Sequence, residues 1–225
     1  MAVTKRFNAP KFWNVKKKES TYVVTPLAGP HSKEHCIPLV IVLRNLLGHA
    51  RTMNEAKKIL STGLIKVNSN VRKEYNFPAG LMDVIDVGGE FYRIVPSKKG
   101  LSLISVNDSH IKLARIMNKT TVTGKKTQLN FHDGTNMLVD KDIYKTSDVV
   151  SIDTVHNTIK ETVKFEKGSL AVVTGGHNSG FKGNIEHIDK VLKTVTLSNG
   201  DVKIPVPIRY VFVVGKDAPL VNIGE

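Results

Sequence analysis

The residues best suited to chemistry in this chain are basic and aromatic, and they are concentrated near its start. Within residues 1–36, cationic side chains lie beside the rings of Phe7, Phe12, Trp13 and Tyr22. Such rings can stack on nucleobases while Lys and Arg contact phosphates, so the segment is a candidate RNA-binding arm. An equally good alternative is that Phe12 and Trp13 dock on a neighbouring domain. The candidate contacts in the arm are Lys5, Arg6, Lys11, Trp13, Lys16, Lys17 and Lys18.

A second group of cations surrounds the start of a predicted helix. Thr52 and Glu55 match the Thr-x-x-Glu pattern of a capping box, and Gly63 is placed to end the helix. The first turn of a helix has unpaired N–H groups and a positive dipole end, which favour phosphate. The alternative is an ordinary capped helix with solvated charges. The candidate contacts here are Arg44, His49, Arg51, Thr52, Asn54, Lys57, Lys58 and Lys66.

A glycine-rich loop over residues 175–183 is the third candidate site. Its glycines allow sharp turns and a close approach of the backbone to a partner. The spacing matches neither G-x-G-x-x-G nor a phosphate-binding loop ending in Gly-Lys-Ser/Thr. A glycine-rich hairpin without a ligand is the alternative. The candidate contacts are Gly175, Gly176, His177, Gly180, Lys182 and Gly183.

Catalytic and metal-binding constellations are not predicted. His31, His35 and Cys36 lie close in sequence, but no fourth ligand follows at a suitable spacing. Because Cys36 is the single cysteine, an internal disulfide is excluded. Ser, His and Asp are common, but no G-x-S-x-G elbow occurs. We therefore expect no enzymatic activity, no metal, no cofactor and no small-molecule substrate.

The net charge is distributed unevenly along the chain. The 225 residues carry a formal charge of +13, and residues 1–73 hold 14 Lys and Arg against three acids. Clustering favours a polyanionic partner over a role in solubility alone. No run approaches the roughly 20 apolar residues of a membrane span, and the start lacks the apolar stretch of a signal peptide. We expect a cytoplasmic protein that does not contact membranes.

Four segments of an α+β fold are predicted to position these residues. They are a basic extended arm (1–36), a small domain with a helix pair and a β hairpin (37–90), a central small β domain (91–165) and a C-terminal β barrel with a tail (166–225). The arm alone cannot bury enough surface to fold, so it is expected to be disordered until it binds.

Helix and strand signals vary in strength along these segments. The first helix is expected from Ile37 to Leu47 and ends at Gly48. Asn107 or Asp108 could cap a short helix that runs through Ala114. Short strands separated by turns dominate thereafter, and those after residue 166 suit an SH3-like barrel.

The helix pair and its hairpin, in this order, resemble a known RNA-binding module. The stretches that carry the likeness are Leu43-Arg44-Asn45-Leu46-Leu47, His49-Ala50-Arg51-Thr52, Glu55-Ala56-Lys57-Lys58-Ile59-Leu60, Gly63, Ile65-Lys66-Val67-Asn68, Val71, Pro78-Ala79-Gly80 and Asp83-Val84-Ile85. The module is the αL type named for bacterial small-subunit ribosomal protein four, and it also occurs in some pseudouridine synthases and tyrosyl-tRNA synthetases. Its helix pair binds structured RNA. Where the family usually has Asn-Gly-Lys at the hairpin, this chain has Asn68-Ser69-Asn70.

Residues 167–185 resemble a KOW motif, found in ribosomal proteins and transcription elongation factors. Together with the arm and the stretch from Leu27 to Leu39, they make nearly the whole chain similar to the archaeal and eukaryotic, "e" type, small-subunit ribosomal protein four. The short arm and the C-terminus without a basic tail look more archaeal than eukaryotic.

This resemblance implies a structural constituent of the small ribosomal subunit. Such a protein binds and organises small-subunit ribosomal RNA beside neighbouring ribosomal proteins. Two alternatives remain open. One is an RNA-modifying enzyme that uses the αL-type module for targeting, and the other is a KOW-type transcription elongation factor.

Overall fold

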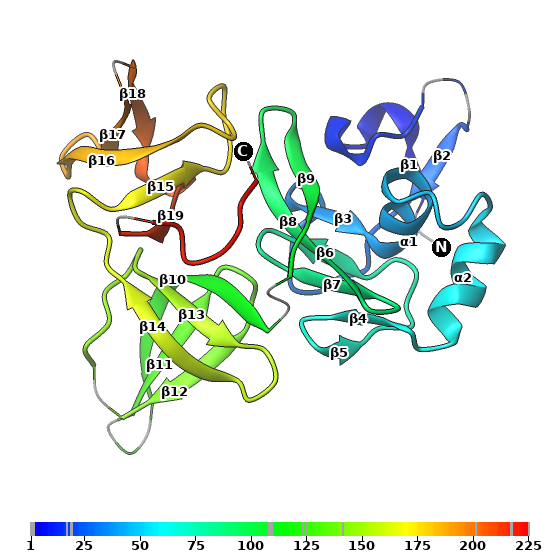
Figure 1. Ribbon diagram of the computed structural model, residues 1–225, viewed down its shortest axis with the longest axis horizontal. Coiled ribbons are helices and arrows are strands. Elements are labelled where there is room, and N and C mark those ends of the chain that lie inside the picture. The colour runs from blue at the N-terminus through cyan, green and yellow to red at the C-terminus, as the bar shows by residue number, and fades with distance from the viewer. Residues whose placement is uncertain are drawn as a thin grey trace. The chain divides into compact units, whose positions relative to one another are not determined.

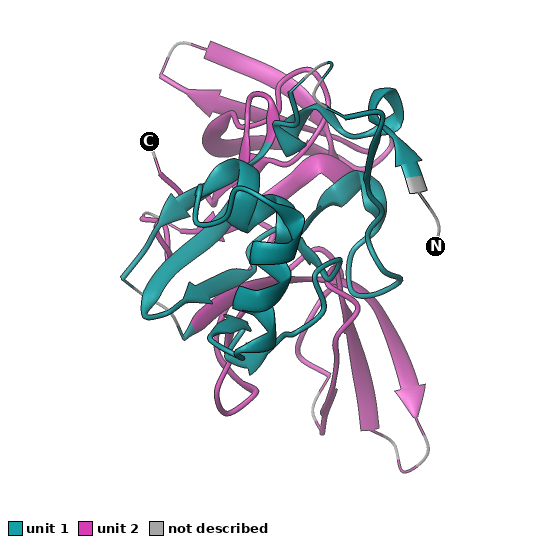
Figure 2. Ribbon diagram, turned by 90° about the vertical axis from the view of Figure 1, so that its right-hand side faces the viewer, with its two compact units in different colours: residues 1–95, 101–110 teal, residues 96–100, 111–225 magenta. Residues whose placement is uncertain are grey.

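The structure is a computed structural model that describes residues 3–16, 18, 20–107, 110–122, 124, 126–140, 142–200, 202–216 and 218–224. Contacts divide the chain into two units, coloured separately in Figure 2. Unit 1 comprises Met1–Val95 and Leu101–His110, and unit 2 comprises Pro96–Gly100 and Ile111–Glu225. Strands predominate over helices, so the fold is α+β.

The helical part of unit 1 consists of two segments (Figure 1). The first begins as α1 (Leu39–Ile41) and continues in π-helical geometry as η4 (Val42–Leu46), and the second is α2 (Met53–Ser61). Both predicted helices are therefore confirmed, but the first begins at Leu39 and not at Ile37, because Ile37 and Pro38 belong to strand β3 (Cys36–Pro38). Gly48, at a φ of 76°, follows the first segment in a conformation that favours glycine.

The strands of unit 1 form one five-stranded sheet and two smaller pairs. The sheet has the order β5-β4-β7-β8-β9, and β1 pairs with β2 and β3 with β6. These strands are β1 (Val3–Lys5), β2 (Tyr22–Val24), β3 (Cys36–Pro38), β4 (Ile65–Val67), β5 (Asn70–Val71), β6 (Pro78–Gly80), β7 (Val84–Val87), β8 (Glu90–Ser97) and β9 (Gly100–Ser105). The expected domain boundary at residue 90 therefore lies at the start of β8, a strand that extends the same sheet.

The N-terminal segment is folded in the structure, unlike the extended arm expected from the sequence. Strands β1 and β2 pair antiparallel, and the 3₁₀ turns η1 (Arg6–Asn8) and η2 (Lys11–Trp13) lie between them. The Trp13 side chain is fully buried, and its Nε1–H donates to the carbonyl oxygen of Cys36 at 2.7 Å. A buried indole removes a large apolar area from water and here satisfies its one donor, which anchors the segment to the core of unit 1.

Unit 2 contains two antiparallel sheets of five strands each. Their orders are β12-β11-β10-β13-β14 and β18-β17-β16-β15-β19. The strands are β10 (Ile111–Val122), β11 (Lys126–Phe131), β12 (Asn136–Val139), β13 (Val149–Asp153), β14 (Thr158–Val163), β15 (Leu170–Val173), β16 (Lys182–Asp189), β17 (Thr194–Asn199), β18 (Val202–Pro207) and β19 (Val211–Gly215). Besides η1 and η2, the described residues form 3₁₀ turns at η3 (Lys33–His35) in unit 1 and at η5 (Ile208–Tyr210) before β19.

Two local predictions differ from the structure. The helix expected through Ala114 is wrong, because Ile111–Val122 is the long strand β10, which pairs with both β11 and β13. Strand β18 was not predicted, since Pro205 and Pro207 argue against a central strand. In the structure β18 lies at the edge of its sheet, the position where proline is tolerated.

Candidate nucleic-acid interface

Most of the predicted contacts of unit 1 are solvent-exposed. We call this set the basic surface, and it comprises Lys5, Lys11, Lys16, Lys18, His49, Arg51, Thr52, Asn54, Lys57, Lys58 and Lys66. Arg44 is half-buried, and its Nε–H donates to Oδ1 of Asn45 at 3.0 Å. Lys17 lies outside the described residues.

Two predicted contacts serve the interior of unit 1 instead. Trp13 is buried in the core, so its ring is not available to a base. Arg6 donates from its guanidinium to the carbonyl oxygens of Val15 and Lys16, which closes the loop around η2. The alternative of docking on a neighbouring domain therefore describes Trp13 correctly.

The start of α2 is capped by the chain itself. The Oγ1 of Thr52 accepts from the N–H of Glu55 at 3.2 Å, which confirms the capping box. The Glu55 carboxylate in turn accepts from the N–H groups of Arg51 at 2.8 Å and Thr52 at 3.3 Å, and these bonds lower the pKa of Glu55. The N–H groups of Arg51, Thr52 and Glu55 are thus occupied and are not available to a phosphate.

Two lysines of the basic surface also have partners within unit 1. The Nζ of Lys57 lies 4.4 Å from the centroid of the Tyr75 ring, and that of Lys66 lies 3.9 Å from Oδ2 of Asp86. Both lysine side chains remain exposed, where such pairs contribute little to stability. Their positive charges therefore stay available to a polyanion.

A groove with a cavity volume of about 600 Å³ lies beside Lys57, because the Tyr75 ring that this lysine contacts lines it. Tyr22 and Leu27 line it from the N-terminal segment, Arg44 and Met53 from the helical part, and Tyr75 from the chain between β5 and β6. The sequence singled out Tyr22 but not Tyr75 or Met53, because no pattern links residues from three separate segments. An apolar groove with two tyrosine rings and one guanidinium has the properties of a base-binding site.

The glycine-rich loop packs closely against other residues of unit 2. A Cβ at Gly175 would lie 3.0 Å from the Tyr210 ring, one at Gly180 2.7 Å from the backbone of Ser97 and Lys98, and one at Gly183 2.6 Å from the carbonyl oxygen of Ser198. These glycines therefore permit internal packing rather than the approach of a partner.

The polar side chains of this loop divide between internal and exposed positions. Lys182 donates from Nζ to the carbonyl oxygen of Gly224, so its charge is tied to the C-terminal segment. Gly176 and His177 are exposed. Of the six predicted contacts in the loop, these two are the ones that a partner can reach directly.

The His31, His35 and Cys36 group does not form a metal site in the structure. The Nε2 of His31 lies 3.0 Å from Oδ2 of Asp83, and burial raises the pKa of the Cys36 thiol to about 12. No group of three or more His, Cys, Asp and Glu side chains among the described residues could hold a metal ion. No helix in the described part of the chain is long and apolar enough to cross a membrane.

Comparisons with known proteins give a consistent result. The profile described as "Ribosomal family S4e" matches residues 88–159, and that of the RS4NT (NUC023) domain matches residues 4–34. The chain is 40% identical to the small ribosomal subunit protein eS4 of Staphylothermus marinus, over 96% of this chain and 93% of that protein. It is 39% identical to the protein of the same name from Pyrobaculum islandicum over the full length of both.

A solved structure gives the same result at the level of the fold. The crystal structure of the 30S ribosomal protein S4e from Thermoplasma acidophilum superimposes with a TM-score of 0.73 at 28% identity. The likeness covers 82% of this chain and 97% of the other.

Proposed function

Because this chain belongs to the S4e family of ribosomal proteins, we propose that it is a structural constituent of the small ribosomal subunit and binds small-subunit ribosomal RNA through its basic surface. The observation that carries the proposal is the nearly full-length similarity to small ribosomal subunit proteins eS4. It also accounts for the archaeal character of the sequence, because Staphylothermus marinus and Pyrobaculum islandicum are archaea. Such a protein works in the cytoplasm as part of the ribosome.

The mechanism is electrostatic and geometric. Lys and Arg that neutralise phosphates release the counterions condensed on RNA, and this release drives association. Residues 1–73 hold 14 Lys and Arg against three acids, and most of these cations belong to the exposed basic surface. Because the N-terminal segment is held by Trp13, its cations are presented in a fixed arrangement, which reduces the conformational entropy lost on binding.

The helix pair and hairpin of unit 1 act as an αL-type RNA-binding module in this proposal. Supporting features are the succession of η4, α2 and the β4–β5 hairpin, together with exposed Arg51, Lys57, Lys58 and Lys66. The groove between Tyr22 and Tyr75 adds a place for an unpaired base beside these phosphate contacts.

The second sheet of unit 2 acts as a KOW-type, SH3-like element in this proposal. Five antiparallel strands and the glycine-rich loop after β15 support that reading. Since Gly175, Gly180 and Gly183 pack internally, the loop contributes shape, and His177 is its exposed contact. The sheet offers this loop to RNA or to a neighbouring ribosomal protein.

Family membership also resolves the alternatives raised by the sequence. The S4e family consists of ribosomal structural proteins, so the chain is not an enzyme. An RNA-modifying activity and a role as a transcription elongation factor are both set aside for the same reason.

Sedimentation tests the proposal. Lysate of the source cells is layered on a sucrose gradient at moderate salt, and the fractions are probed for this protein. We expect it to sediment with small subunits and with whole ribosomes, and to shift to light fractions after ribonuclease treatment. A protein found in the light fractions alone before treatment would refute the proposal.

A further inference from the structure

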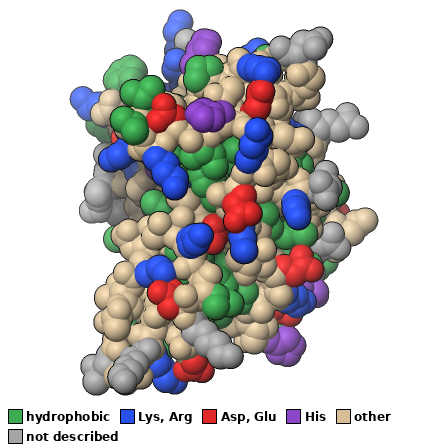
Figure 3. All heavy atoms as spheres, turned by 90° about the vertical axis from the view of Figure 1, so that its left-hand side faces the viewer, with side chains coloured by type: hydrophobic (Ala, Val, Ile, Leu, Met, Phe, Trp, Pro, Cys, Tyr) green, Lys and Arg blue, Asp and Glu red, His purple; other side chains and the backbone are tan. Residues whose placement is uncertain are grey.

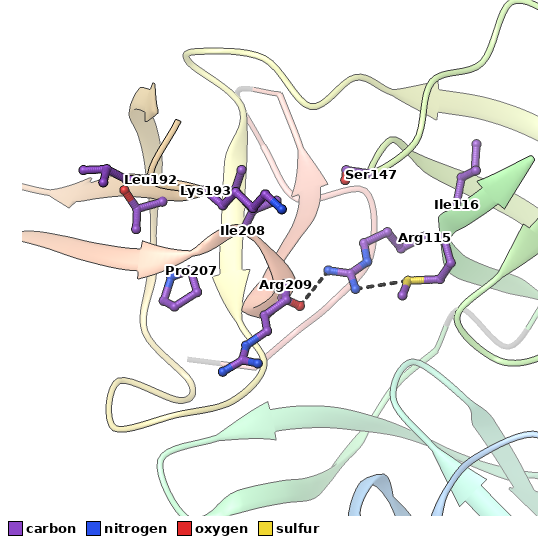
Figure 4. A pocket seen from close by; sticks show the side chains of 10 residues that line it. Arg115, Ile116, Ser147, Leu192, Lys193, Pro207, Ile208 and Arg209 are labelled. Atoms are coloured by element: carbon purple, nitrogen blue, oxygen red, sulfur yellow. Dashed lines mark hydrogen bonds between the residues drawn. The ribbon is translucent and has the colours of Figure 1, made fainter. Parts of the chain in front are cut away.

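A cavity of about 610 Å³ opens between the two sheets of unit 2 (Figure 4). Leu192 and Lys193, in the turn between β16 and β17, line it together with Ile208 and Arg209 of η5. Arg115 of β10 lines the opposite side, as Figure 4 shows. None of these residues belongs to the basic surface of unit 1.

The edge of this cavity carries exposed aliphatic side chains. Leu192 and its neighbour Val191 are 72% and 90% exposed. Their turn is held in place because the Asp189 carboxylate accepts from the N–H of Val191 at 2.8 Å and from that of Leu192 at 3.0 Å. Met117, at a bulge in the pairing of β10 with β11, is 45% exposed on the other side. A rigid turn and a bulge thus present apolar groups to solvent.

The charges lining the cavity are all positive. Nη1 of Arg115 donates to the carbonyl oxygens of Arg209 at 2.9 Å and Val211 at 3.0 Å, and desolvation lowers the pKa of Arg115. No carboxylate in the described part of unit 2 forms an ion pair with Arg115, Lys193 or Arg209. On the face shown in Figure 3, hydrophobic side chains are exposed among charged side chains of both signs. An occupant that supplies both apolar surface and negative charge would complement this cavity.

We propose that this cavity binds an acidic, aliphatic segment of a neighbouring protein, with a Leu, Ile or Val side chain between Leu192 and Ile208 and an adjacent carboxylate beside Lys193 and Arg209. Protein fits better than RNA because the lining contains no aromatic ring on which a base could stack. Aliphatic walls also match aliphatic side chains, and a pocket that receives one anchoring residue is a common centre of a protein interface. The proposal rests on the proposed function for its setting, a ribosomal subunit with protein neighbours.

Site-specific photo-crosslinking tests this proposal. The full chain carrying Leu192→p-benzoylphenylalanine is assembled into small subunits reconstituted from archaeal ribosomal RNA and proteins, irradiated, and its adducts are identified by mass spectrometry. Because Leu192 is exposed, the substitution leaves the hairpin intact. Met117→p-benzoylphenylalanine probes the other side independently, and Val155→p-benzoylphenylalanine, exposed in the turn after β13, is the matched control.

We expect the probes at 192 and 117 to give adducts with one protein segment rich in Asp or Glu and aliphatic residues, and the control to give none with that segment. Adding Lys193→Gln and Arg209→Gln should lower the adduct yield several-fold. Adducts with RNA, with a segment that lacks carboxylates, or no adduct above the control would overturn the proposal. Failure of the chain to enter the subunits would instead contradict the proposed function.

Discussion

At the residue scale, a buried polar cluster explains why two distant stretches of unit 1 depend on each other. Oδ2 of Asp83 lies 3.0 Å from Nε2 of His31 and accepts from the N–H of Gly80 at 2.8 Å. Its other oxygen accepts from Nδ2 of Asn68 at 2.8 Å. Asn68 and Ser69 have φ values of 50° and 66°, so the turn that departs from the usual Asn-Gly-Lys still adopts a left-handed conformation. The Asn68 side chain therefore serves the fold rather than RNA.

Substituting Gly80 tests the packing of this cluster. A Cβ at that position would lie 2.3 Å from the His31 ring, so we expect Gly80→Ala to lower the free energy of unfolding of unit 1 by about 3 kcal/mol. Trp13, the single tryptophan, lies in the core of unit 1, so its fluorescence during urea unfolding reports on this unit. Gly88→Ala, where a Cβ meets nothing within 4 Å but φ is 63°, should cost about 1 kcal/mol. Equal losses in both variants would contradict this packing argument.

The lowered pKa of the Asp153 carboxylate predicts how the stability of unit 2 depends on pH. Hydrogen bonds from Nζ of Lys160 and from the N–H of Val155 lower the pKa of Asp153 to about 2. An unfolded Asp has a pKa of about 3.9. Because the pKa of Asp153 is lower in the folded than in the unfolded state, its ionised carboxylate stabilises the fold at pH values above the unfolded pKa. This stabilisation is lost as the pH falls from about 4 to about 2.

We therefore expect Asp153→Asn to reduce the loss of stability of unit 2 between pH 4 and pH 2. Urea unfolding followed by circular dichroism at several pH values measures this change. Asp140→Asn is the control, because that carboxylate is exposed and pairs with the exposed Lys126. If the Asp153→Asn chain shows the same acid dependence as the unsubstituted protein, the hydrogen bonds of Asp153 do not stabilise the folded state.

At the scale of elements, local signals predicted the structure well, whereas contacts between distant segments were not predictable. The capping box at Thr52 and the glycines at 48 and 63 placed the helices because these signals act within a few residues. The docking of the N-terminal segment depends on the bond between Trp13 and Cys36, 23 residues apart. The sequence around Trp13 is therefore compatible with docking and with RNA stacking alike.

In the candidate site, too, local features were predictable from the sequence and contacts between distant segments were not. Exposure of the cations was predictable, because Lys57 and Lys58 lie off the apolar positions of α2. The groove was not, since Tyr22, Met53 and Tyr75 meet only through the tertiary fold. That Lys182 and three of the loop glycines serve internal packing also follows from tertiary contacts alone.

The groove predicts a contribution to RNA affinity that does not depend on charge. Replacing both ring residues, as Tyr22→Leu with Tyr75→Leu, should weaken binding to archaeal small-subunit ribosomal RNA by about 1–3 kcal/mol for a stacked base. The dependence of affinity on salt should stay unchanged, because no cation is removed. Tyr22→Phe with Tyr75→Phe is the control, since it keeps both rings in the groove and should leave the affinity unchanged. Filter binding over a range of salt concentrations measures both quantities, and an unaltered affinity in the double variant would exclude the groove as a base site.

At the scale of the whole molecule, the two units have different roles. Unit 1 carries the basic surface and the tyrosine-lined groove, which suit a folded RNA. Unit 2 carries the apolar, positively charged cavity between its sheets, which suits a protein neighbour. A protein that binds RNA through one unit and protein through the other can hold several components of a ribonucleoprotein together.

The salt dependence of RNA binding tests the central claim most directly. We expect Arg51→Ala, Lys57→Ala, Lys58→Ala and Lys66→Ala, combined in one chain, to weaken binding to archaeal small-subunit ribosomal RNA. The slope of the logarithm of affinity against the logarithm of salt concentration should become shallower by about 3, because each lost phosphate contact removes about 0.7–0.9. A control chain carries Ala at four exposed lysines of unit 2, Lys164, Lys167, Lys190 and Lys216. It should change the slope by less. An unchanged slope in the first variant, or a larger change in the control, would show that RNA does not bind at the basic surface of unit 1.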